Sequence, residues 1–233
     1  MTNQESIVRK KKLEGKLIFK SVFSLVLIIA ITFIGAGRID YWQGWVYNGL
    51  NIIFLLLSYF LLPLDLIEER LKPKEGIKKW DKIYYIVSTP VYFAILIISI
   101  LDGGRFGWEP RIPIFVLIIG IVVYIIGQAM ILWAKKVNKF FSSVVRIQKD
   151  RGQTVCKEGP YRLVRHPGYL GGLLYIIVTP FVLGSFWGLI PVVIAVILLF
   201  IRTYLEDKTL QRELEGYTDY TNKTRYRLLP GIW

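Results

Sequence analysis

The sequence has almost none of the two residue types that bind most transition metals and perform most nucleophilic catalysis. Its 233 residues include one cysteine, Cys156, and one histidine, His166. A single cysteine excludes an internal disulfide and any CxxC metal site. With one histidine as well, a zinc or di-iron site would need to be built almost wholly from carboxylates, so we predict no metal site.

Acidic residues are also scarce, with 17 Asp and Glu against 30 Lys and Arg, a net charge of +13. The basic residues are unevenly placed, because 27 of the 30 lie in residues 1–20, 66–82, 135–168 and from residue 202 onward. Only Arg38, Arg105 and Arg111 lie in the alternate loops. This split follows the positive-inside rule, so we expect both termini and the two basic loops on the cytoplasmic side. Nucleic-acid binding would need basic and stacking aromatic residues on one solvated surface, and we predict no nucleic-acid partner.

Long polar stretches are missing between the basic segments, and hydrophobic residues make up 54% of the chain. Six runs approach the roughly 20 residues that cross a bilayer: 17–37, 44–64, 83–101, 112–134, 169–184 and 187–205. The last two predict a hairpin with a short turn near Ser185. The predicted fold class is therefore an all-α, multi-pass integral membrane protein of about six spans, without a Rossmann domain.

The chain changes character near residue 135, which predicts two regions. Residues 1–134 form an N-terminal region of four spans. Residues 135–233 form a second region with a basic loop, the helical hairpin and an aromatic, basic tail. Within it we expect an exposed, turn-rich loop over 148–158, and we interpret 68–82 as a solvated connection between spans.

The only histidine lies in the stretch "GPYRLVRHPGYLGG", residues 159–172. One interpretation is structural, because Pro167 suits the first turn of the following helix. The alternative is a ligand site, because glycine pairs let a ligand approach the backbone and Tyr161 and Tyr169 supply aromatic faces. With Arg162 and Arg165 adding positive charge, the stretch suits a ligand that has an anionic and an aromatic part.

The second candidate group follows the last apolar run and comprises Arg202, Glu206 and Asp207. Arg202 and Glu206 could form an i,i+4 ion pair on one helix. A charge at the end of a span more often faces a cavity than lipid. Because the hairpin turn is short, we expect His166 and Tyr169 to lie beside Arg202 and Glu206 at the cytoplasmic end.

These motifs together resemble a known family. "GPYRLVRHPGYLG", then "RTYLEDKTL" after a hydrophobic hairpin, then "GYTDYTNKTRYRLLP" are similar to the isoprenylcysteine carboxyl methyltransferase family and the wider group of membrane phospholipid methyltransferases. The resemblance covers about the last hundred residues. The sequence departs from many members at Asp207, where they have a second glutamate.

The resemblance implies a membrane enzyme that uses S-adenosyl-L-methionine in a cytoplasmic pocket. The residues it assigns to the cofactor are Gln148, Gln153, Thr154, Val155, Cys156, Tyr161, His166, Pro167, Gly168, Tyr169 and Glu206. It assigns Arg202 to the substrate and to catalysis.

The acceptor implied first is a prenylated or lipid-like carboxylate that reaches the site from the membrane, and the product is a methyl ester. Methylation of a phospholipid amine or a small thiol on the same fold stays open. Two other classes also stay open: a nicotinamide-dependent reductase like the membrane sterol reductases, and a scaffold or transporter without catalysis.

Overall fold

The computed structural model describes residues 3–63, 66, 67, 69, 76–108 and 110–233. In this part of the chain every regular element is helical, as predicted. The α-helices are α1 Asn3–Ala36, α2 Trp42–Leu61, α4 Lys79–Ile100, α5 Ile114–Val137, α6 Pro167–Val182, α7 Leu189–Glu213 and α8 Tyr217–Lys223. A π-helical turn, η1 Leu101–Phe106, extends α4, and two short 3₁₀ turns, η2 Lys149–Arg151 and η3 Gly159–Arg162, lie between α5 and α6.

Five of these helices are long and apolar enough to cross a membrane, which confirms the predicted class of multi-pass helical protein. They are Ile18–Ala36, Trp42–Leu61, Lys79–Phe106, Ile114–Val137 and Leu189–Glu213. The sixth predicted span is α6, which has only 16 residues and contains Pro180. At about 1.5 Å per residue it is some 24 Å long, shorter than the hydrocarbon layer.

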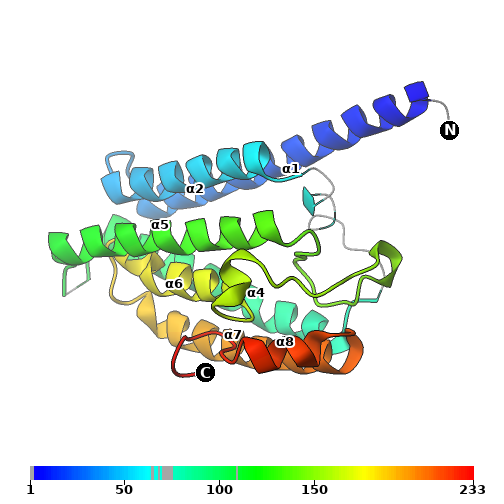
Figure 1. Ribbon diagram of the computed structural model, residues 1–233. Coiled ribbons are helices and arrows are strands. Elements are labelled where there is room, and N and C mark those ends of the chain that lie inside the picture. The colour runs from blue at the N-terminus through cyan, green and yellow to red at the C-terminus, as the bar shows by residue number, and fades with distance from the viewer. Residues whose placement is uncertain (1–2, 64–65, 68, 70–75, 109) are drawn as a thin grey trace.

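The helices form a bundle with α6 in the middle, while α7 and α8 lie along the edge opposite α1 and α2 (Figure 1). α6 packs along α5, and α7 packs against both α4 and α6, while α1 and α2 lie side by side at one edge.

Two glycines let α5 and α6 approach closely. A Cβ at Gly127 would lie 2.7 Å from the carbonyl oxygen of Gly171, and one at Gly171 would lie 2.5 Å from that of Gly127. Gly171 therefore serves helix packing rather than ligand access.

The predicted hairpin is confirmed, since α6 ends at Val182 and α7 begins at Leu189. In the turn, the Ser185 hydroxyl oxygen accepts the N–H of Gly188 at 3.1 Å. α7 runs 25 residues to Glu213, and Gly216 then adopts a left-handed φ of 75° before α8. The first arm of the hairpin thus starts where the second arm ends, at one end of the bundle.

The first predicted loop, 68–82, is less solvated than expected, whereas the second, 148–158, is mostly exposed as predicted. Positions 68 and 70–75 of the first loop lie outside the described residues, but Glu69 and Asp81 are buried. Both Arg146 Nη2 and Arg146 Nε approach Glu69 Oε1, at 2.7 and 2.9 Å, and Arg146 Nη1 donates to Asp150 at 2.8 Å. This buried pair joins the first loop to the segment that leads into the second loop. Gln148, at the start of that predicted loop, is only 1% exposed.

Candidate functional site

A pocket opens at the end of the bundle where α5 and α7 end and α6 begins. Its volume is about 810 Å³ with its open mouth included. We call it the C-terminal pocket. The structure brings together in its walls all eleven residues that the resemblance assigns to a cofactor: Gln148, Gln153, Thr154, Val155, Cys156, Tyr161, His166, Pro167, Gly168, Tyr169 and Glu206.

One wall is the segment from Gln148 to Cys156, which is held in place by its own amide side chains. Gln153 Oε1 accepts the Gln148 backbone N–H at 2.6 Å. The Gln148 side chain donates to the Phe140 carbonyl at 2.7 Å and accepts from Arg151 at 2.6 Å. Gln148 therefore lines the pocket, but its amide is engaged in shaping the loop.

The residues deeper in this wall are neutral. The Tyr161 hydroxyl accepts a hydrogen bond from Asn138 Nδ2 at 3.1 Å, and burial raises the pKa of Tyr161. Burial also raises the pKa of the half-buried Cys156 thiol, whose sulfur lies 3.8 Å from the Val137 carbonyl. A thiol with a raised pKa stays protonated at neutral pH, so Cys156 is no ready nucleophile.

His166 is fixed at the start of α6 by contacts on three sides. It is the residue before Pro167, and its backbone N–H donates to the Arg227 carbonyl at 2.9 Å. Its ring stacks on Tyr169, with the centroids 5.7 Å apart and the planes at 21°. Its Nε2 lies 3.2 Å from Asp207 Oδ1. The helix-entry interpretation of His166 is confirmed, and the same residue also lines the C-terminal pocket.

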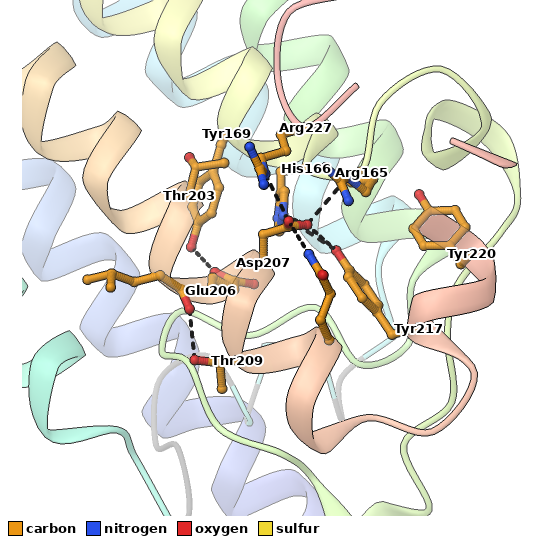
Figure 2. A network of polar contacts seen from close by, with 12 residues as sticks. Arg165, His166, Tyr169, Thr203, Glu206, Asp207, Thr209, Tyr217, Tyr220 and Arg227 are labelled. Atoms are coloured by element: carbon orange, nitrogen blue, oxygen red, sulfur yellow. Dashed lines mark hydrogen bonds and ion pairs between the residues drawn. The ribbon is translucent and has the colours of Figure 1, made fainter. Parts of the chain in front are cut away.

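Asp207 is the centre of a polar network that lies beside His166 (Figure 2). Besides His166, its carboxylate accepts hydrogen bonds from Tyr217 at 3.0 Å, Arg227 at 2.9 Å and Gln211 at 2.7 Å. Arg165 Nε lies 3.4 Å from Oδ1. Burial, with Asp207 alongside, raises the pKa of Tyr217, which keeps that hydroxyl a donor. The buried Asp207 charge is therefore compensated from four elements of the chain.

Sequence reasoning identified Asp207, His166 and Arg165 but missed three residues that follow the hairpin and complete the network and the pocket wall. Tyr217, Tyr220 and Arg227 follow the hairpin, and the first two line the C-terminal pocket. Tyr220 donates to the Tyr161 carbonyl at 2.6 Å, which ties α8 to the opposite wall. The aromatic and basic character of the tail was the available signal.

Glu206 is the acid that faces the pocket. The Tyr169 hydroxyl donates a short hydrogen bond to Glu206 Oε2, as Figure 2 shows. Glu206 is half-buried, and Tyr169 is its hydrogen-bond partner among the described residues. The hairpin prediction is confirmed here, because residues 37 positions apart meet across the two arms.

Arg202 lies one turn earlier on α7 and outside the pocket wall. Its Nε donates to Asp81 Oδ1 at 2.9 Å, and its Nη2 donates to the Ser143 carbonyl at 2.7 Å. Its guanidinium also contacts aromatic faces, with Cζ 4.6, 4.8 and 5.4 Å from the ring centres of Tyr84, Tyr85 and Tyr169. The partner of Arg202 is thus Asp81 rather than Glu206, the i,i+4 partner considered above.

Comparison with known proteins agrees with the motifs. Residues 118–212 match the model of the isoprenylcysteine carboxyl methyltransferase (ICMT) family. Two rice proteins, from Oryza sativa subsp. indica and subsp. japonica, are each named "Probable protein-S-isoprenylcysteine O-methyltransferase". Each is 36% identical to this chain over 66 residues, which is 28% of the chain and 35% of the relative.

The matched region runs from α5 through most of α7 and so contains most of the pocket wall, although the chain matches only about a third of the length of the rice relatives. These matches confirm the resemblance seen in the motifs: over residues 118–212 the chain is similar to the isoprenylcysteine carboxyl methyltransferase family.

Proposed function

We propose that the protein is an S-adenosyl-L-methionine-dependent methyltransferase that methylates the carboxyl group of a prenylated or lipid-like acceptor. The observation that carries the proposal is the convergence of eleven motif residues on one pocket. They come from three separate segments, and nothing in helix packing alone requires them to share a cavity.

The groups in the pocket fit the proposed cofactor, which supplies an activated methyl group when bound. Glu206 can accept hydrogen bonds from a ribose diol or an ammonium, since its carboxylate is held by Tyr169 on one oxygen. At the start of α6, the Gly168 N–H has no backbone acceptor among the described residues, so it can bind a carboxylate. The faces of Tyr161 and Tyr169 suit a flat base or a sulfonium cation.

The acceptor is proposed to enter from the bilayer beside α4 and α7. Its carboxyl group meets the aromatic and cationic cluster of Arg202, Tyr84, Tyr85 and Tyr169, which borders the pocket at Tyr169. Asp81 already holds the Nε edge of Arg202, so a bidentate bond from a substrate to that edge requires Asp81 to move. Arg202 Nη1 donates to neither Asp81 nor the Ser143 carbonyl, so it can donate one hydrogen bond to a substrate carboxylate.

Methyl transfer to a carboxylate requires little acid–base catalysis by the protein. The acceptor carries no proton at neutral pH, so no general base is needed. The role of the chain is to align the two reactants in line and to exclude water. The walls closed by Tyr161, Tyr217 and Tyr220 suit that role, and the lack of a reactive thiolate or second histidine is no obstacle.

We also propose that the C-terminal pocket and both chain ends face the cytoplasm. The pocket is lined by residues of 138–169 and 206–220, which, Tyr169 apart, belong to two of the four segments that together hold 27 of the 30 basic residues. The proposed cofactor is made in that compartment.

The direct test is methyl transfer by protein purified in detergent, with labelled S-adenosyl-L-methionine and three acceptors: a prenylated cysteine, an aminophospholipid and a small thiol. We expect label in a base-labile ester of the prenylated cysteine, and none with Glu206→Ala. Label only in the amine or the thiol would contradict the carboxyl assignment, and no transfer to any acceptor would contradict the proposed activity.

A further inference from the structure

A second pocket lies at the opposite end of the same helices. It is lined by the ends of α1 and α6, the starts of α2 and α5, and the turn η1, and its volume is about 1050 Å³ with its open mouth included. The C-terminal pocket begins at Asn138, just past α5, whereas this pocket includes Ile114, the first residue of α5. The 24 residues of α5 separate the two by about 36 Å. We call the second one the arginine pocket.

Part of the lining of the arginine pocket is an irregular turn. The π-helical turn η1 widens the end of α4, a distortion that is frequent at functional sites. Two glycines make it possible, because a Cβ at Gly103 would collide with the Leu183 carbonyl and one at Gly104 would lie 2.7 Å from the Ala36 Cβ. Arg38 Nε donates to the Gly104 carbonyl at 2.8 Å, which holds the turn against α1.

All three basic residues of the sparsely charged loops line this one pocket. Arg38 comes from the connection between α1 and α2, Arg105 and Arg111 come from the connection between α4 and α5, and each is exposed. Asp102 is the one carboxylate among the described residues of the lining. The excess of guanidinium groups suits a phosphate, which arginine binds through paired N–H groups.

Two acceptors beside the arginines need a donor. Asp102 is 2% exposed and its Oδ2 has no hydrogen-bond partner among the described residues. Gln43 also lines the pocket, and its Oε1 likewise has no hydrogen-bond partner among the described residues. Buried polar atoms are nearly always satisfied, so the pair points to a ligand that carries N–H donors next to its anionic group.

The position of the pocket relative to the membrane indicates that such a ligand comes from the bilayer. Trp42 and Trp108 line it and are 45% and 41% exposed, and Trp187 packs edge-on against Trp108 with the centroids 6.3 Å apart. Half-exposed tryptophans at the ends of spans mark the level of the lipid headgroups. A ligand at this level is in contact with the membrane rather than only with bulk water.

We propose that the arginine pocket binds the headgroup of a membrane aminophospholipid, with the phosphate on the arginines and the primary ammonium on Asp102 and Gln43. The lipid is a bound partner and is not methylated there, because the pocket is a bundle length from the C-terminal pocket. The proposal does not depend on the methyltransferase function.

The test measures lipid binding by native mass spectrometry of the full chain, delipidated in detergent. The probes are phosphatidylethanolamine, phosphatidylcholine, which has no N–H donor, and phosphatidylglycerol, which has no cation. The wild type should bind phosphatidylethanolamine about fivefold or more tightly than either. Arg105→Gln, a change at an exposed side chain, should remove most of that binding, while Arg212→Gln, an exposed arginine outside both pockets, should not.

Asp102→Asn should abolish the preference for phosphatidylethanolamine over phosphatidylcholine, and if this buried variant fails to fold, the Arg105→Gln comparison still decides. Equal lipid binding by Arg105→Gln and Arg212→Gln would overturn the proposal, as would equal binding of the three lipids by the wild type. Free phosphoethanolamine binding as tightly as the lipid would overturn the membrane source.

Discussion

Arg202 and Asp81, 121 positions apart, form a buried ion pair between α7 and α4, with Nε donating to Oδ1 over 2.9 Å. The same aspartate accepts the Val145 N–H on Oδ2 at 2.7 Å, and Arg202 donates to the Ser143 carbonyl. The pair therefore joins both helices to the segment that begins the C-terminal pocket. The pair holds this segment in place against α4 and α7.

Removing one partner of this pair should strongly destabilise the protein. Asp81→Ala leaves the Arg202 charge buried without compensation, which costs about 3–5 kcal/mol. The matched control is Glu213→Ala, which breaks the half-exposed Lys78–Glu213 pair and should cost about 0–1 kcal/mol. The measurement is the free energy of unfolding in detergent, and equal losses in the two variants would show that Arg202 is compensated elsewhere.

Asp207 should control how firmly the tail closes the C-terminal pocket. The Arg165 and His166 N–H groups donate to the Tyr226 and Arg227 carbonyls, both at 2.9 Å. Asp207→Asn removes the charge that draws Arg165, His166 and Arg227 together, so these two amides should exchange at least about tenfold faster.

The measurement is hydrogen exchange followed by mass spectrometry on the peptide that contains both amides. Asp219→Asn, at an exposed acid of α8, should leave the exchange unchanged. Protection that survives in Asp207→Asn would mean that the backbone pairing holds the tail without Asp207.

The raised pKa of Cys156 gives a reporter that needs no mutation, because it is the only cysteine. A thiol that keeps its proton in the folded state becomes a thiolate only at higher pH. Alkylation by iodoacetamide should therefore keep rising with pH above about 8.5, the ordinary cysteine pKa, and level off earlier in the unfolded chain. Because Cys156 lines the C-terminal pocket, S-adenosylhomocysteine should slow the reaction. Rapid alkylation at neutral pH would contradict the neutral thiol.

The proposed orientation places the two pockets on opposite sides of the membrane. In a Cys156→Ser background, a cysteine at Lys157 should react with an impermeant maleimide only from the cytoplasmic side. One at Ile39, which is 74% exposed beside the arginine pocket, should react only from the other side. Labelling of both positions from one side would contradict the orientation.

The helices and the motif residues of the pocket were largely predictable from local sequence. Apolar runs near 20 residues predict spans, and a short turn at 183–188 requires the ends of the hairpin to meet, which is how Tyr169 and Glu206 come together. The other residues of the pocket wall, from Gln148 to Tyr169, were predicted from the resemblance to a known family, because the motif assigns them to one site.

The contacts that sequence reasoning missed join residues far apart in the chain. Nothing near Asp81 indicates Arg202, and an i,i+4 alternative at Glu206 was available on the same helix. Glu69 was expected in a solvated loop but is buried because Arg146 compensates it. The turn η1 depends on the glycine contacts with α1 and α6, which no local pattern encodes.

The proposal that the C-terminal pocket holds the methyl donor is tested most directly by calorimetric titration of the purified protein with S-adenosylhomocysteine. We predict saturable binding of one ligand per chain, at least about tenfold weaker in Glu206→Ala and unchanged in Glu213→Ala, an acid of the same helix outside the pocket. Absence of binding by the wild type, or equal affinity in Glu206→Ala, would contradict it.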